Sequence, residues 1–123
     1  MVKAGQIYDI WFSFKPPIMP GQPPGKYRPA LILSVSEDGT ATAVAIKFTG
    51  TGPTRRYPLR VPIVDWVSAG LDKESYAEID SELPVRFTGS VSPRGELEEH
   101  DLNRILVEYT KHQRSIRRGG ATT

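Results

Sequence analysis

The 123-residue sequence contains no cysteine, which excludes disulfide bonds and thiolate-coordinated metals. This absence fits a reducing compartment, so we expect a cytoplasmic protein. Histidine is scarce as well: His100 and His112 would lie on different faces of a helix, because each helical residue turns by about 100°. We therefore expect no metal site, no other cofactor and no acid–base catalysis by paired histidines.

Long apolar runs are also missing from the sequence. No segment approaches the roughly 20 consecutive apolar residues that a membrane-spanning helix needs. The first six residues lack the apolar stretch of a secretory signal. We expect neither a membrane association nor export.

The composition is otherwise that of a folded domain rich in turns. Hydrophobic residues make up 38% and charged residues 24%, and the chain has 11 prolines and 11 glycines. Proline and glycine favour short strands and tight turns over a helical bundle. The length predicts a single domain, residues 1–116, followed by a disordered basic tail at residues 117–123.

Positive charge is concentrated in the first half of the chain, although the net charge is only +2. Between residues 10 and 64 there are two acidic residues against seven basic ones: Lys15, Lys26, Arg28, Lys47, Arg55, Arg56 and Arg60. Such an imbalance favours a polyanionic partner such as a nucleic acid. A mixed, solvated surface without a partner is the alternative.

Patterns of alternating and β-branched residues predict several short strands. We place them at residues 6–14, 29–35, 40–48, 57–64, 75–80 and 85–91, with a tight turn at 37–39 that joins the second and third into a hairpin. Pro58 and Pro62 confine the fourth strand to a sheet edge, and residues 65–71 form a turn closed by Gly70. Apolar residues at helical spacing predict a helix from residue 96 or 98 to 113. The predicted fold class is α+β, mostly β: a small antiparallel barrel with a C-terminal helix.

Residues 15–25 contain five prolines and cannot form regular structure. Long loops in compact domains are usually functional or disordered. We interpret this one as a lid over a site, and a proline-rich docking ligand is the alternative.

The sequence is organised around the segment from Gly25 to Ser34. Gly25 permits backbone angles that other residues avoid. Pro29 pushes Arg28 toward an extended conformation, and residues 30–33 are continuously apolar, as in a buried strand. Arg28 therefore lies at the mouth of a buried strand, where packing alone does not explain a cation.

If the second and third strands pair, Arg28 faces the end of the third strand, at Thr49. A guanidinium beside a hydroxyl can bind phosphate oxygens. With an RNA 2′-hydroxyl as the nucleophile, such a site could also stabilise the charge that develops during strand cleavage. The alternative is that Arg28 caps loop carbonyls and Thr49 belongs to a turn.

Four segments together resemble the PemK/MazF type II toxins, endoribonucleases with an SH3-like barrel. Residues 4–8 resemble the opening strand of that family, and residues 25–34 are similar to its Gly-x-x-Arg-Pro-x-Leu-Val-x-Ser motif. Residues 44–49 resemble the strand that ends in the family's threonine, and residues 69–76 its Gly-Leu-x-x-x-Ser strand entry. The resemblance spans roughly residues 4–110.

The resemblance implies a metal-independent endoribonuclease that cleaves single-stranded RNA by 2′-hydroxyl attack. Arg28 would act in proton transfer and charge stabilisation, and Thr49, in competition with Thr51, would support the transition state. Asp80 matches an acidic position that some members use for RNA contact or catalysis. Gln22 is the one polar residue kept from the family's first loop.

The resemblance also implies partners: RNA, a second copy of the chain in a homodimer, and a small antitoxin that covers the RNA groove. Tyr27 could stack on a base, and further RNA contacts are expected from Lys26, Thr51, Arg55 and Arg56. A non-catalytic RNA- or antitoxin-binding barrel is the first alternative. An adaptor barrel that docks through its proline-rich loop is the second.

Overall fold

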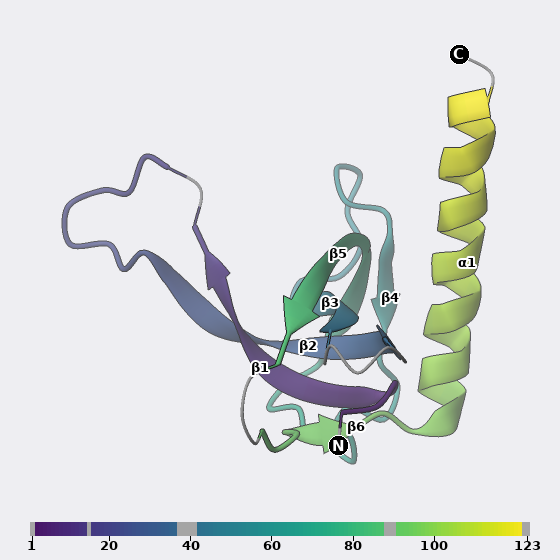
Figure 1. Ribbon diagram of the computed structural model, residues 1–123, viewed down its shortest axis with the longest axis horizontal. Coiled ribbons are helices and arrows are strands. Elements are labelled where there is room, and N and C mark those ends of the chain that lie inside the picture. The colour runs from purple at the N-terminus through teal and green to yellow at the C-terminus, as the bar shows by residue number, and fades with distance from the viewer. Residues whose placement is uncertain (1, 15, 37–41, 88–90, 122–123) are drawn as a thin grey trace.

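The computed structural model describes residues 2–14, 16–36, 42–87 and 91–121 (Figure 1). These residues form one antiparallel sheet of six strands, in the order β4-β5-β3-β2-β1-β6, and one helix. The elements are β1 Gln6–Ser13, β2 Gly25–Val35, β3 Thr42–Thr49, β4 Arg60–Pro62, β5 Tyr76–Arg86, β6 Gly95–Glu96 and α1 Glu99–Ala121.

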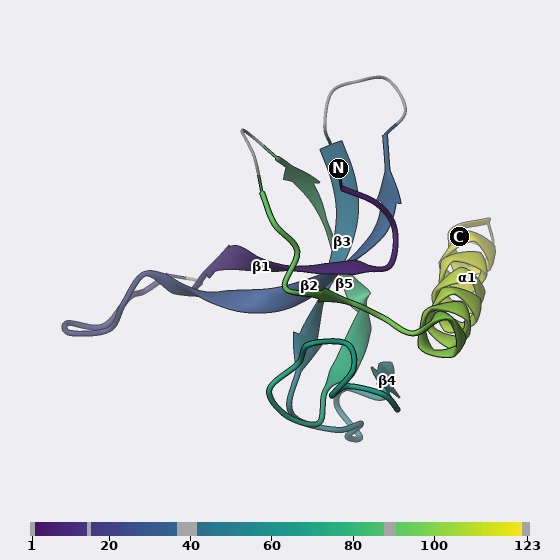
Figure 2. The same ribbon diagram turned by 90° about the horizontal axis from the view of Figure 1, so that it is seen from below.

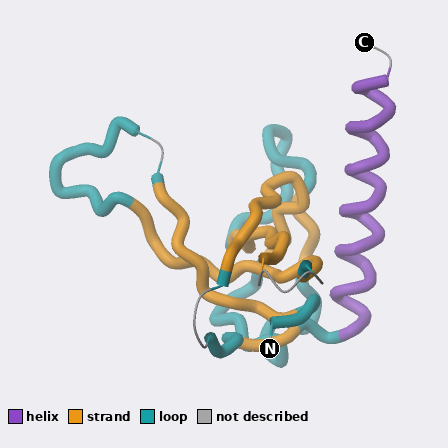
Figure 3. Tube along the Cα trace, in the orientation of Figure 1, coloured by secondary structure: helices purple, strands orange, loops and turns teal. Residues whose placement is uncertain are grey.

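The sheet curls into a half-barrel, and α1 stands beside it (Figures 1 and 2). Strands dominate the trace in Figure 3, and the single helix follows the last strand. The predicted α+β class, mostly β with a C-terminal helix, is confirmed. No helix in the described ranges combines the length and apolar character needed to cross a membrane.

The main core lies between the sheet and α1. Its largest fully buried side chains include Ile7, Leu31, Ile46, Ile79 and Ile105, from four strands and the helix. Burying each such side chain stabilises the fold by roughly 1.5–3 kcal/mol. This core fixes the positions of β2 and β3, which carry the candidate site.

A second apolar cluster covers the other face of the same strands and contains Tyr8, Ala30, Ile32, Ala43 and Ala45. Successive residues of a strand point to opposite faces. The strand β2 is therefore buried on both faces in its middle, which explains the continuous apolar run from residue 30 to 33.

The strand β2 begins at Gly25, four residues before the predicted start, because residues 25–28 pair with β1. Arg28 thus lies within the strand, opposite Ile10. Gly25 is required by space rather than by unusual backbone angles: a Cβ at this position would lie 2.4 Å from the carbonyl oxygen of Phe12 and 2.8 Å from the ring of Trp11.

The prediction of separate strands at 75–80 and 85–91 is wrong, since β5 runs without a break from Tyr76 to Arg86. Pro84 lies inside it and pairs with Val44 of β3, while β4 reaches only the first residues of β5. Pro84 is tolerated because β4 does not pair with β5 at that point. Residues 88–90 lie outside the described residues.

Three other boundaries differ from the sequence prediction. The predicted strand at 57–64 shortens to β4, although its place at the sheet edge is confirmed. The two-residue strand β6 was not predicted. The helix continues to Ala121 and includes residues 117–121 of the predicted tail, because no proline ends the helix after residue 113.

Two predicted turns fare differently. The turn at 65–71 is confirmed, and Gly70 closes it with a φ of 85°. Strands β2 and β3 pair as predicted, but the tight turn at 37–39 lies outside the described residues.

Candidate functional site

A recess of about 210 Å³ opens where β2 and β3 meet the segment that leads into β5. Its lining combines cations, hydroxyls and two aromatic residues: Lys26, Tyr27, Arg28, Pro29, Phe48, Thr49, Gly50, Lys73 and Ser75. Among the residues that the structure describes, no carboxylate or histidine lines this recess. The recess is therefore suited to a small anionic group.

The register of β2 and β3 brings Arg28 and Thr49 to this recess. Ala30 pairs with Lys47, and continuing that antiparallel register by two residues places Arg28 opposite Thr49. Arg28 is half-buried, and within the described ranges its guanidinium has no ion pair or hydrogen bond to another group. Its donors are free to bind a ligand.

The two candidate threonines have different environments. Thr49 lines the recess, and its Oγ1 accepts a hydrogen bond from the backbone N–H of Thr51 at 3.3 Å. Thr51 itself is exposed and does not line the recess. The geometry favours Thr49 over Thr51 as the partner of Arg28.

The predicted base-stacking residue Tyr27 lies at the recess with 68% of its surface exposed. It pairs across the strands with Trp11, and the two rings meet edge to face with centroids 5.3 Å apart. Such aromatic pairs are favourable beyond the area that they bury. Trp11 thus holds one side of Tyr27, while most of the ring remains accessible. Lys26 lines the same recess.

Arg55 and Arg56 do not line the recess; they lie exposed in the loop between β3 and β4. The guanidinium of Arg56 packs over the ring of Tyr57 at 5.4 Å. Arg60 covers the same ring at 4.6 Å and forms an ion pair with Glu78 at 3.4 Å. These contacts organise the loop.

Asp80 is exposed and does not line the recess, so the structure does not bring this predicted catalytic residue to Arg28. The end of β5 next to Thr49 is Tyr76, and Asp80 lies four residues farther along the strand, in the stretch where the pairing of β5 with β3 is irregular. Glu78, two residues before Asp80, is half-buried and forms ion pairs with Lys47 at 3.8 Å and with Arg60 at 3.4 Å.

Gln22 lies in the loop that joins β1 and β2. This loop projects away from the half-barrel (Figures 1 and 2), and none of its described residues lines the recess. The interpretation of the loop as a lid is therefore wrong for this structure. The Oε1 of Gln22 accepts a hydrogen bond from the N–H of Met19 at 3.2 Å, which shapes the loop.

Sequence reasoning missed two residues of the recess, Lys73 and Ser75. Ser75 is buried, and its hydroxyl donates a hydrogen bond to the carbonyl of Lys73 at 2.9 Å. The signal was present in the segment 69–76, which was recognised as a strand entry but not as part of a site.

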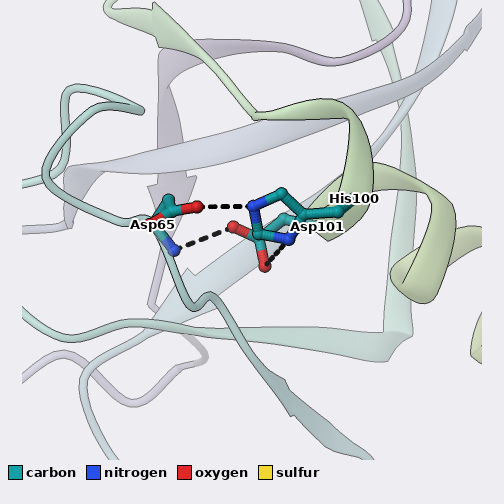
Figure 4. Close-up of side chains that lie close together, drawn as sticks. All are labelled: Asp65, His100 and Asp101. Atoms are coloured by element: carbon teal, nitrogen blue, oxygen red, sulfur yellow. Dashed lines mark hydrogen bonds and ion pairs between the residues drawn. The ribbon is translucent and has the colours of Figure 1, made fainter.

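A second polar cluster lies where α1 begins (Figure 4). Asp65, His100 and Asp101 offer ligand atoms within 4.8 Å of one another. Asp101 is fully buried, and its carboxylate accepts hydrogen bonds from the N–H groups of Val64 (3.0 Å) and Asp65 (2.9 Å) and from Arg104 (2.6 Å). Because these donors occupy both oxygens, the cluster is explained by fastening the start of α1 to the loop between β4 and β5.

The structure is similar to a chain in the crystal structure of MazE-MazF (Form-II) from Deinococcus radiodurans. The TM-score is 0.60, the match covers 94% of each chain, and the sequences are 21% identical. At this identity the likeness shows the fold alone, and it confirms the predicted resemblance to PemK/MazF toxins at that level. No protein-family profile matches the sequence, and a comparison with curated proteins finds no match.

Proposed function

We propose that this protein is the toxin of a type II toxin–antitoxin system, an endoribonuclease that cleaves single-stranded RNA without a metal ion. The observation that carries the proposal is the recess in which an unpaired Arg28 meets Thr49. The shared fold supports it, because the matched crystal structure contains the toxin MazF with MazE. Homodimerisation and neutralisation by an antitoxin belong to the same proposal.

The reaction needs a site for developing negative charge. The 2′-oxygen bonds to the adjacent phosphorus and the bond from phosphorus to the 5′-oxygen breaks, which leaves a 2′,3′-cyclic phosphate and a 5′-hydroxyl. The 2′-hydroxyl proton leaves to water, and the 5′-oxygen takes up a proton. Charge grows on the non-bridging oxygens, where Arg28 can donate two hydrogen bonds and Thr49 one.

A direct assay tests the proposal. Purified protein is incubated with mixed single-stranded RNA in EDTA, and the cut ends are mapped. We expect cleavage with cyclic phosphate ends, and none in RNA that carries 2′-deoxyribose at the cut position. Intact RNA at protein levels where a known ribonuclease works would contradict the proposal.

The lining of the recess favours one second candidate, a non-catalytic RNA-binding barrel. None of the residues that line the recess has a carboxylate or an imidazole that could take the 2′-hydroxyl proton. Salt-sensitive RNA binding without cleavage would select this candidate.

A further inference from the structure

We infer that Lys73 is a phosphate-binding residue of the recess, placed opposite Arg28 so that an RNA phosphate lies between the two cations. This inference rests on the proposed function, since the ligand is the RNA backbone. It begins from the lining of the recess, which Lys73 shares with Arg28 and Thr49. The segment that carries Lys73 precedes β5, whereas Arg28 and Thr49 lie on β2 and β3.

The sequence does not suggest this role, because Lys73 stands between Asp72 and Glu74, either of which could neutralise its charge. In the structure, neither acid forms an ion pair with Lys73. Asp72 forms an ion pair with Arg94 at 2.8 Å, and Glu74 lines a separate opening beside Trp66. Within the described ranges no carboxylate lies within ion-pair distance of Lys73, so its charge is available to a ligand.

The absence of a side chain at Gly50 leaves room for the ammonium group of Lys73. A Cβ at position 50 would come within 2.8 Å of Cε and 2.9 Å of Nζ of Lys73. Both contacts are closer than real Cβ atoms allow, and the lysine end is the part that can move. The ammonium group therefore rests against the Gly50 backbone, directly after Thr49. The Gly50→Ala substitution displaces this charge without removing it.

The test measures binding of single-stranded RNA whose 2′-hydroxyls are methylated, so that binding is separated from cleavage. We expect Lys73→Met to weaken binding about tenfold, as loss of one charge-assisted hydrogen bond predicts. The plot of log affinity against log salt should become shallower by about 0.7, the value for one phosphate on a single strand. Lys111→Met is the matched control, since Lys111 pairs with Glu108 on the helix surface.

Gly50→Ala should lower the affinity less than Lys73→Met does, and should have no further effect in the Lys73→Met background. If both variants keep wild-type affinity and salt dependence, the inference is overturned, even where the wild-type protein cleaves RNA. If the wild type binds RNA but never cleaves it, the endoribonuclease proposal fails, while weaker and less salt-dependent binding by Lys73→Met still supports the phosphate site.

Discussion

Charged side chains occupy two contrasting environments in this molecule. At the start of α1, the buried carboxylate of Asp101 has its oxygens filled by two backbone N–H groups and Arg104. In the recess, Arg28 and Lys73 have no carboxylate partner among the described residues. In the first arrangement the partners of the charged group lie inside the fold, and in the second the charged groups remain available to a ligand. The contrast separates a structural cluster from a functional one better than residue type does.

The largest expected effect on stability is that of Asp101→Ala. It leaves the N–H groups of Val64 and Asp65 without their acceptor and removes one of the two acceptors of the Arg104 guanidinium, which also donates to the carbonyl of Pro62. Breaking a buried ionic network in this way costs about 3–5 kcal/mol. Chemical denaturation measures the loss. The control is Glu108→Ala, which removes an exposed pair and should cost at most about 1 kcal/mol. Equal effects would erase the contrast.

Arg28→Ala should show the reverse pattern. Removing a group that stabilises transition-state charge lowers kcat about 10²- to 10³-fold, whereas the free energy of unfolding should change by no more than about 0.5 kcal/mol, because the Arg28 side chain has no hydrogen bond or ion pair to lose within the described residues. RNA cleavage kinetics and denaturation of the same preparation measure both quantities. Arg114→Ala, on the exposed helix surface, should change neither. Full activity of Arg28→Ala would remove this arginine from the mechanism.

The part of this contrast that depends on local sequence patterns could be predicted from the sequence. The apolar run at residues 30–33 predicts a buried strand, and hairpin pairing then places Arg28 across from Thr49. The continuous strand β5 could not be predicted, because the tolerance of Pro84 depends on where the neighbouring strand β4 ends. That end is a property of the folded sheet, not of the local sequence.

The roles of charged residues were harder to predict, because they depend on partners that are distant in sequence. In the sequence, Lys73 stands next to Asp72, which suggests that the acid neutralises it. In the structure, Asp72 forms an ion pair with Arg94 instead. In the sequence, Asp80 matches a position that could hold a catalytic acid. In the structure, the residue of β5 that pairs with Thr49 is Tyr76, and Asp80 does not line the recess. Both outcomes depend on contacts that the sequence pattern does not encode.

A smaller effect is expected from Tyr27→Ala, which extends the contrast to aromatic residues. Tyr27 is 68% exposed at the recess, whereas Tyr57 is 42% exposed, lies on another loop and has Arg56 and Arg60 over its ring. Loss of one base-stacking contact should weaken binding of uncleavable RNA by about 1–3 kcal/mol. Tyr27→Phe should retain the affinity, and Tyr57→Ala should leave it unchanged. A comparable loss in Tyr57→Ala would place the RNA on the other loop.

The smallest expected effect is a pH dependence of the stability of the fold. It arises from a third polar contact, between Tyr109 of α1 and Glu82 of β5. The hydroxyl of Tyr109 donates a hydrogen bond to Glu82, and burial, together with this bond and the charge of Glu82, raises the pKa of Tyr109 from 10.0 to about 12. Because the folded-state pKa is the higher one, the stabilisation is complete below pH 10.0 and is lost as pH rises through about 12.

The thermal unfolding midpoint measured across this range should fall more in the wild type than in Tyr109→Phe. Burial also raises the pKa of Tyr8, so the difference between the two proteins isolates Tyr109. Parallel curves would show that Tyr109 and Glu82 do not stabilise the docking of α1. A divergence confined to alkaline pH would show that the hydrogen bond from Tyr109 to Glu82 helps to hold α1 against β5, as the buried Asp101 network holds the start of the helix, whereas the cations of the recess keep their donors for a ligand.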